Sequence, residues 1–94
     1  MDQNTIEEAA ALLVAARRSG VLIDRLPDRC RPAGAADAMA IQEATVRQLG
    51  ERVAAWKVTT IDGALVRGAI LASRYFDTPA SVPARLVPLL GVEA

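Results

Sequence analysis

The sequence predicts an α+β fold in which two N-terminal amphipathic helices are followed by β-strands. Apolar residues recur at intervals of three and four through the first part of the chain, as they do along one face of a helix. A glycine follows each of these periodic segments, at the place where helices commonly end. From residue 52 onward the pattern changes to β-branched and aromatic residues, which favour strands.

The first helix is expected over residues 5–19. Thr5 and Glu8 have the spacing of a capping box, in which each side chain accepts a hydrogen bond from the backbone N–H of the other residue. Gly20 supplies the C-terminal stop. The apolar face of this helix carries Ile6, Ala9, Ala10, Leu13 and Ala16.

The second helix is expected over residues 35–49, with Gly50 as its stop. The segment before it contains two prolines and is interpreted as a loop. Glu43 and Arg47 lie one turn apart, so they are expected to form a solvated pair on the exposed face. The other face carries Ala38, Ile41, Thr45 and Leu49.

A β-hairpin is expected after the helices, with a first strand over residues 52–61, a turn at Asp62-Gly63 and a second strand over residues 64–72. Both faces of the first strand are mostly apolar, so we expect it to be covered on two sides. Lys57 would then be buried, which is rare for lysine without a functional reason. The alternative is that its stem covers apolar surface while its amine reaches solvent. Trp56 is expected to be the largest anchor of the core.

Length and composition predict one small domain over residues 1–94. Apolar residues make up 52% of the chain, but many are alanines and aromatic residues make up only 3%, so the core is expected to be shallow. A small domain with few large anchors commonly depends on a partner subunit or on further polypeptide. We therefore expect a homo-oligomer rather than an isolated monomer.

The charge balance argues against nucleic-acid and membrane partners. Eleven basic and eleven acidic residues cancel, so no field attracts a polyanion or an anionic membrane. No apolar stretch approaches the length of about 18 residues that spans a bilayer, and the polar N-terminus is unlike a signal peptide, so the cytoplasm is the expected location. The sequence has no histidine, which excludes Ser-His-Asp and Cys-His catalysis and histidine-ligated zinc within these residues.

The loop before the second helix contains the one cysteine of the chain. Cys30 lies between Arg29 and Arg31, whose charges would lower the pKa of its thiol, so a reactive thiol and an inert loop cysteine both remain possible. The basic residues of this loop, Arg25 included, alternate with aspartates and are expected to be solvated. The alternative is that they bind a carboxylate.

Four segments in a fixed order resemble one enzyme family. They are Asp37-Ala38-Met39-Ala40-Ile41-Gln42, Trp56-Lys57-Val58, Gly68-Ala69-Ile70-Leu71-Ala72-Ser73-Arg74 and Gly91-Val92-Glu93-Ala94. Over nearly its whole length the chain resembles the N-terminal segment of the 2-keto-4-pentenoate hydratases of the fumarylacetoacetate hydrolase superfamily. This resemblance implies the N-terminal part of a fumarylacetoacetate hydrolase-like fold, and a domain that continues beyond the residues given. The chain departs from the family pattern at Thr59, where relatives have glycine, and at Val66, where they have an acidic residue.

The resemblance implies a hydro-lyase of aromatic-compound catabolism that adds water to a 2-hydroxydienoate, an acid of the 2-keto-4-pentenoate type. The family holds Mg²⁺ or Mn²⁺ with three carboxylates, and Glu93 would be the first of them. Lys57 is the implied catalytic residue, which positions water or moves a proton. One carboxylate does not hold a divalent ion against water, so the 94-residue chain alone is expected to be inactive.

Two interpretations from other classes remain beside the enzyme. One is a stand-alone, non-catalytic interaction module that uses its alanine-rich helices to pair with itself or with a larger subunit. The other is a helix-turn-helix DNA-binding domain, which the long loop between the helices and the zero net charge disfavour.

Overall fold

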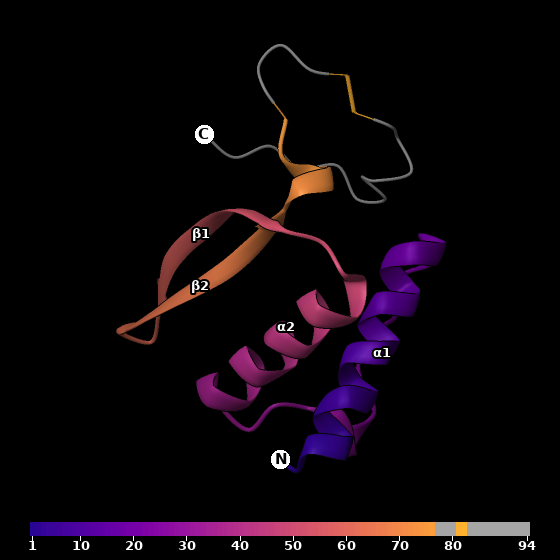
Figure 1. The fold of residues 1–94 in the computed structure, drawn as a ribbon. Coiled ribbons are helices and arrows are strands. Elements are labelled where there is room, and N and C mark those ends of the chain that lie inside the picture. Colours follow the sequence, from indigo (N-terminus) through magenta and orange to yellow (C-terminus); the bar gives the residue numbers. More distant parts are fainter. Residues whose placement is uncertain (77–80, 83–94) are drawn as a thin grey trace.

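The computed structural model describes residues 1–76 and 81–82, and within them two helices precede a two-stranded antiparallel sheet (Figure 1). The α+β class expected from the sequence is therefore confirmed. The described elements are α1 (Gln3–Ser19), a short 3-10 turn η1 (Asp28–Cys30), α2 (Ala35–Leu49), β1 (Val53–Ile61), β2 (Ala64–Leu71) and a second 3-10 turn η2 (Ala72–Arg74).

Helix α1 begins two residues earlier than predicted, because a different residue caps it. The Oδ1 atom of Asp2 accepts a hydrogen bond from the Thr5 backbone N–H at 2.7 Å. The predicted capping box of Thr5 and Glu8 is wrong, and Glu8 pairs instead with Arg29. Gly20 ends the helix as predicted, with a φ of 74° in the left-handed region that glycine adopts without strain.

Helix α2 has the predicted bounds, and polar side chains join it to α1. Arg47 forms an ion pair with Glu7 of α1 rather than the predicted pair with Glu43. Gln48 donates from Nε2 to Oε2 of Glu7 at 2.7 Å. A residue on α1 therefore fixes the position of two residues in the last turns of α2.

The core of the described residues lies between the two helices, which pack against each other in Figure 1. Small side chains on both helices allow close approach, and the side chain of Cys30 fills space beside them. This agrees with the shallow core that the composition predicts. The buried cluster contains Ile6, Ala9, Ala10, Cys30, Ile41 and Ala44.

The hairpin forms as predicted, with its turn at Asp62 and Gly63, whose φ values are 50° and 78°. It lies beside α2 (Figure 1) and is much more exposed than the sequence suggested. Val58 is 56% exposed and Leu65 is 76% exposed, so the prediction that the first strand is covered on both sides is wrong for the described residues. Trp56 is 43% exposed and is not the core anchor. Apolar side chains of β1 such as Val58 and Ile61 therefore remain at the surface of the described residues.

None of the helices in the described part of the chain has the length and apolar character needed to cross a membrane.

Candidate functional site

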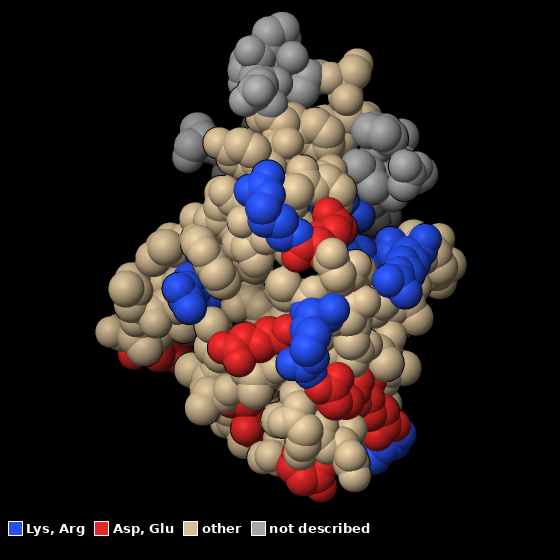
Figure 2. Space-filling model, in the orientation of Figure 1, with Lys and Arg blue, Asp and Glu red and all other residues tan. Residues whose placement is uncertain are grey.

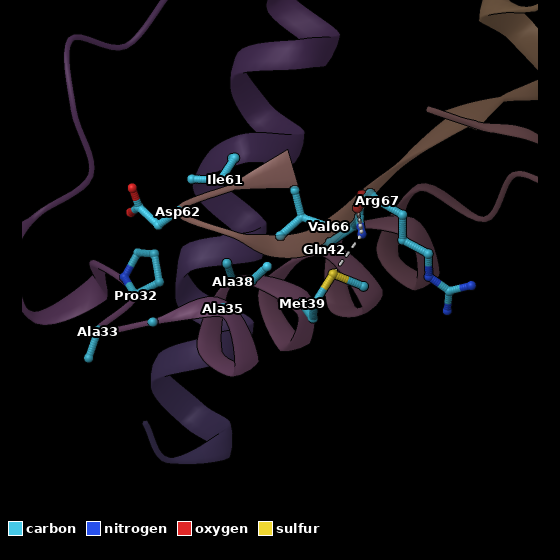
Figure 3. Close-up of a pocket in the computed structure, with 12 residues that line it drawn as sticks. Pro32, Ala33, Ala35, Ala38, Met39, Gln42, Ile61, Asp62, Val66 and Arg67 are labelled. Carbon is cyan, nitrogen blue, oxygen red and sulfur yellow. Dashed lines mark hydrogen bonds between the residues drawn. The ribbon is translucent and has the colours of Figure 1, made fainter. Parts of the chain in front are cut away.

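A groove of about 630 Å³ separates the N-terminal half of α2 from the tip of the hairpin (Figure 3). One wall comes from the loop and helix, through Pro32, Ala35 and Met39. The other comes from the hairpin, through Ile61 and Val66. These five side chains are apolar, so the groove suits the carbon skeleton of a small ligand better than a highly charged one.

Gln42 closes the inner end of this groove by extending the edge of β2. Its Oε1 atom accepts the backbone N–H of Ala69 at 2.8 Å, and its Nε2 atom donates to the backbone carbonyl of Arg67 at 3.2 Å. The amide thus binds the sheet edge as a neighbouring strand would. Gln42 belongs to a segment that carries the resemblance, but this contact was not predicted. The one available signal was an amide on a helix face otherwise occupied by apolar residues.

The structure places Lys57, the sequence-predicted catalytic residue, on the surface of the hairpin. Its side chain is exposed, so the expected burial is wrong and the alternative of a solvent-exposed lysine agrees with the structure. Lys57 pairs across the strands with Gly68, and the next pair along the same face is Thr59 with Val66. Lys57 therefore lies on the face of the hairpin that carries Val66, although its own side chain does not line the groove.

Gly68 contributes no side chain to the hairpin, and the side chain of Gln42 lies beside it. A Cβ atom at this position would have Oε1 of Gln42 as its nearest described neighbour, at 3.9 Å, which is an ordinary contact distance. Across the strands from Lys57, the position of Gly68 therefore contributes no side chain.

Asp37 holds the loop at the mouth of the groove. Its carboxylate accepts the backbone N–H of Ala33 at 3.0 Å and lies 3.4 Å from the N-terminal ammonium of Met1. The hydrogen bond from Ala33, together with the N-terminal charge, lowers the pKa of Asp37. Asp37 therefore has a structural role at the start of α2.

The implied metal ligand, Glu93, lies outside the described residues. Within residues 1–76 and 81–82, no three carboxylate, cysteine or histidine side chains are close enough to hold one metal ion. The described residues therefore do not fit a complete site for a divalent cation.

Cys30 is wholly buried, and its burial raises the pKa of the thiol. Arg29 lowers this pKa as expected, but desolvation and the nearby Glu8 carboxylate outweigh it, which favours the inert cysteine over the reactive thiol. The basic residues of the loop have carboxylate partners, as expected for a solvated loop. These pairs are Arg25 with Asp24 at 3.4 Å, Arg29 with Glu8, and Arg31 with Asp28 at 3.5 Å.

Comparisons of the chain with protein-family models, with characterised proteins and with solved structures gave no match. The functional interpretation therefore depends on the residues and the geometry described above.

Proposed function

We propose that this chain is the N-terminal part of a hydratase-like lyase with a fumarylacetoacetate hydrolase-like fold. Its reaction is the addition of water to a 2-hydroxydienoate, an acid of the 2-keto-4-pentenoate type. The order of the four sequence segments supports this proposal, as does the succession of two helices and an antiparallel hairpin.

The observation that carries the proposal is the cross-strand pair of Lys57 with Gly68. The two residues belong to separate segments of the resemblance, and the hairpin register brings them together on one face. The position directly across the strands from Lys57 therefore carries no side chain that would pack against the lysine.

In the proposed reaction, the oxygen of water forms a bond to one carbon of the conjugated acid and a proton is delivered to another. Lys57 would hold the water or carry this proton, since an ammonium group donates and an amine accepts. The apolar groove beside Val66 would receive the carbon skeleton of the acid.

The proposal also requires Mg²⁺ or Mn²⁺, which would supply Lewis-acid stabilisation of the developing enolate. Glu93 is its proposed first ligand. Within the described residues no three carboxylate, cysteine or histidine side chains lie together, so its other ligands would come from outside them.

Lys57→Ala tests the proposal in the polypeptide encoded by the complete reading frame that contains these residues. Turnover of 2-hydroxypenta-2,4-dienoate should fall by a factor of about 100 or more, as is typical for loss of a proton-transferring group. Arg25→Ala, at an exposed loop arginine, is the matched control and should keep turnover. Equal turnover by the Lys57 variant and the control would remove Lys57 from the proposed mechanism.

The exposed apolar side chains of the hairpin favour a second candidate function, a non-catalytic interaction module. Leu65 and Val58 are too exposed to stabilise the described fold by burial. A module of this kind would gain stability from its partner, so thermal unfolding that shifts with protein concentration would favour it.

A further inference from the structure

A second groove, of about 310 Å³, adjoins the first, shares Met39, Val66 and Arg67 with it, and extends onto the face of the hairpin opposite Lys57. Val58 and Leu65 line the strand side of this groove, and Met39 of α2 lines its helix side. The two hairpin side chains are more than half exposed. Val58, Leu65 and Met39 together form an apolar strip at the surface. Such a strip is typical of a protein interface.

A positive charge lies on the strand side of this strip. The guanidinium of Arg67 lies over the ring of Trp56, with Cζ 4.2 Å from the ring centroid. Among the described residues, no carboxylate forms an ion pair with Arg67. Stacking holds the guanidinium in place while leaving its N–H groups able to donate.

A negative charge lies on the helix side of the same strip. Glu43 follows Met39 by one helical turn, so the two side chains lie on the same side of α2. Glu43 is exposed, and the part of the chain that the structure describes gives its carboxylate no hydrogen bond or ion pair. Figure 2 shows acidic and basic side chains interspersed over the visible surface rather than separated into one-sign regions.

We infer that this face binds a second copy of the same chain about a two-fold axis that runs along the groove. Such an axis places the helix side of the groove in each copy against the strand side of the groove in the other. Glu43 of each copy then lies opposite Arg67 of the other, and Met39 of each copy packs against Val58 and Leu65 of the other between the charges.

The charge pattern selects a second copy over an unrelated partner. Arg67 lies on the strand side of the groove and Glu43 on the helix side, so the charges of this face are complementary to those of a second copy. The net charge of zero means that no overall repulsion opposes pairing. Tryptophan, methionine and arginine are also the residue types enriched at interface centres. The inference does not depend on the proposed catalysis, since it concerns the association of two chains and none of its contacts involves Lys57.

Sedimentation velocity of the 94-residue chain over a range of concentrations tests the inference. The wild-type chain should form dimers, and Leu65→Asp should weaken dimerisation by about tenfold or more. Arg67→Glu and Glu43→Arg should each weaken it by about tenfold, because each places like charges together at both ends of the contact. The double variant carrying both substitutions should restore dimerisation to within about threefold of wild type.

Arg25→Glu, on the loop away from this face, is the matched control and should leave dimerisation unchanged. Far-UV circular dichroism should show that each variant keeps its secondary structure. A wild-type chain that stays monomeric at about 100 μM would overturn the inference, as would dimers that are insensitive to Leu65→Asp. Failure of the double variant to restore dimers would also overturn it, since the charges would then not face each other.

Discussion

The side chain of Gln42 accepts the backbone N–H of Ala69 at 2.8 Å and thereby attaches helix α2 to strand β2. Its Nε2 atom also donates to the carbonyl of Arg67. One amide therefore satisfies two backbone groups on the outer edge of the hairpin. This contact sets the position of the hairpin relative to the helices, and with it the positions of both grooves.

Gln42→Ala should destabilise the chain by about 1–3 kcal/mol, because it leaves the Ala69 N–H and the Arg67 carbonyl without this partner. Urea unfolding followed by circular dichroism measures the change. Gln3→Ala is a matched control, since Gln3 makes an exposed hydrogen bond to Glu7. The interpretation of Gln42 fails if the two variants lose the same small amount of stability.

Local features of the fold could be predicted from the sequence, because short-range signals determine them. The bounds of α2 follow from its apolar spacing and from Gly50, and the hairpin turn follows from Asp62-Gly63. The start of α1 was missed because two residues, Asp2 and Thr5, offer alternative caps, and only the folded geometry distinguishes them. Contacts between elements were not predictable in the same way.

The site was predicted less well than the fold, because it depends on burial and on long-range contacts. The apolar pattern around Lys57 is the same whether a strand is covered by this chain, by further chain or by a partner. The sequence therefore left both burial and exposure of Lys57 open, and the structure shows exposure. The burial of Cys30 depends on the loop folding back against both helices, which a local reading of its charged neighbours does not reveal.

Asp2 should make the stability of the chain depend on pH. The hydrogen bonds from Thr5 lower the pKa of Asp2 below its ordinary value of 3.8. Its contribution to stability is therefore complete above that ordinary value and is lost as the pH falls through the lower folded-state pKa. Asp2→Asn keeps a capping acceptor but removes the titration, so its melting temperature should fall less steeply between about pH 5 and pH 2.

Asp2→Ala removes the cap as well and should lower the melting temperature throughout this pH range. Asp24→Asn, which changes an exposed loop carboxylate, is the matched control. Thermal scans at several pH values measure the three variants. The same pH dependence in Asp2→Asn as in wild type would contradict the assigned role of Asp2.

Cys30 should behave as a protected core thiol. Its burial hinders access and raises the pKa of the thiol, and both effects lower the concentration of reactive thiolate. Alkylation by iodoacetamide near pH 8 should therefore be at least about tenfold slower in the folded chain than in urea. Equal rates in the two states would show that the thiol is accessible in the folded chain.

The most direct test of the proposed function is the consumption of 2-hydroxypenta-2,4-dienoate, followed by its ultraviolet absorbance with Mg²⁺ or Mn²⁺ present. The polypeptide encoded by the complete reading frame should consume this acid with formation of its hydrated product, and the 94-residue chain alone should not, because Glu93 by itself cannot hold the metal. Absence of metal-dependent hydration by the complete polypeptide would contradict the hydratase proposal and favour the interaction module.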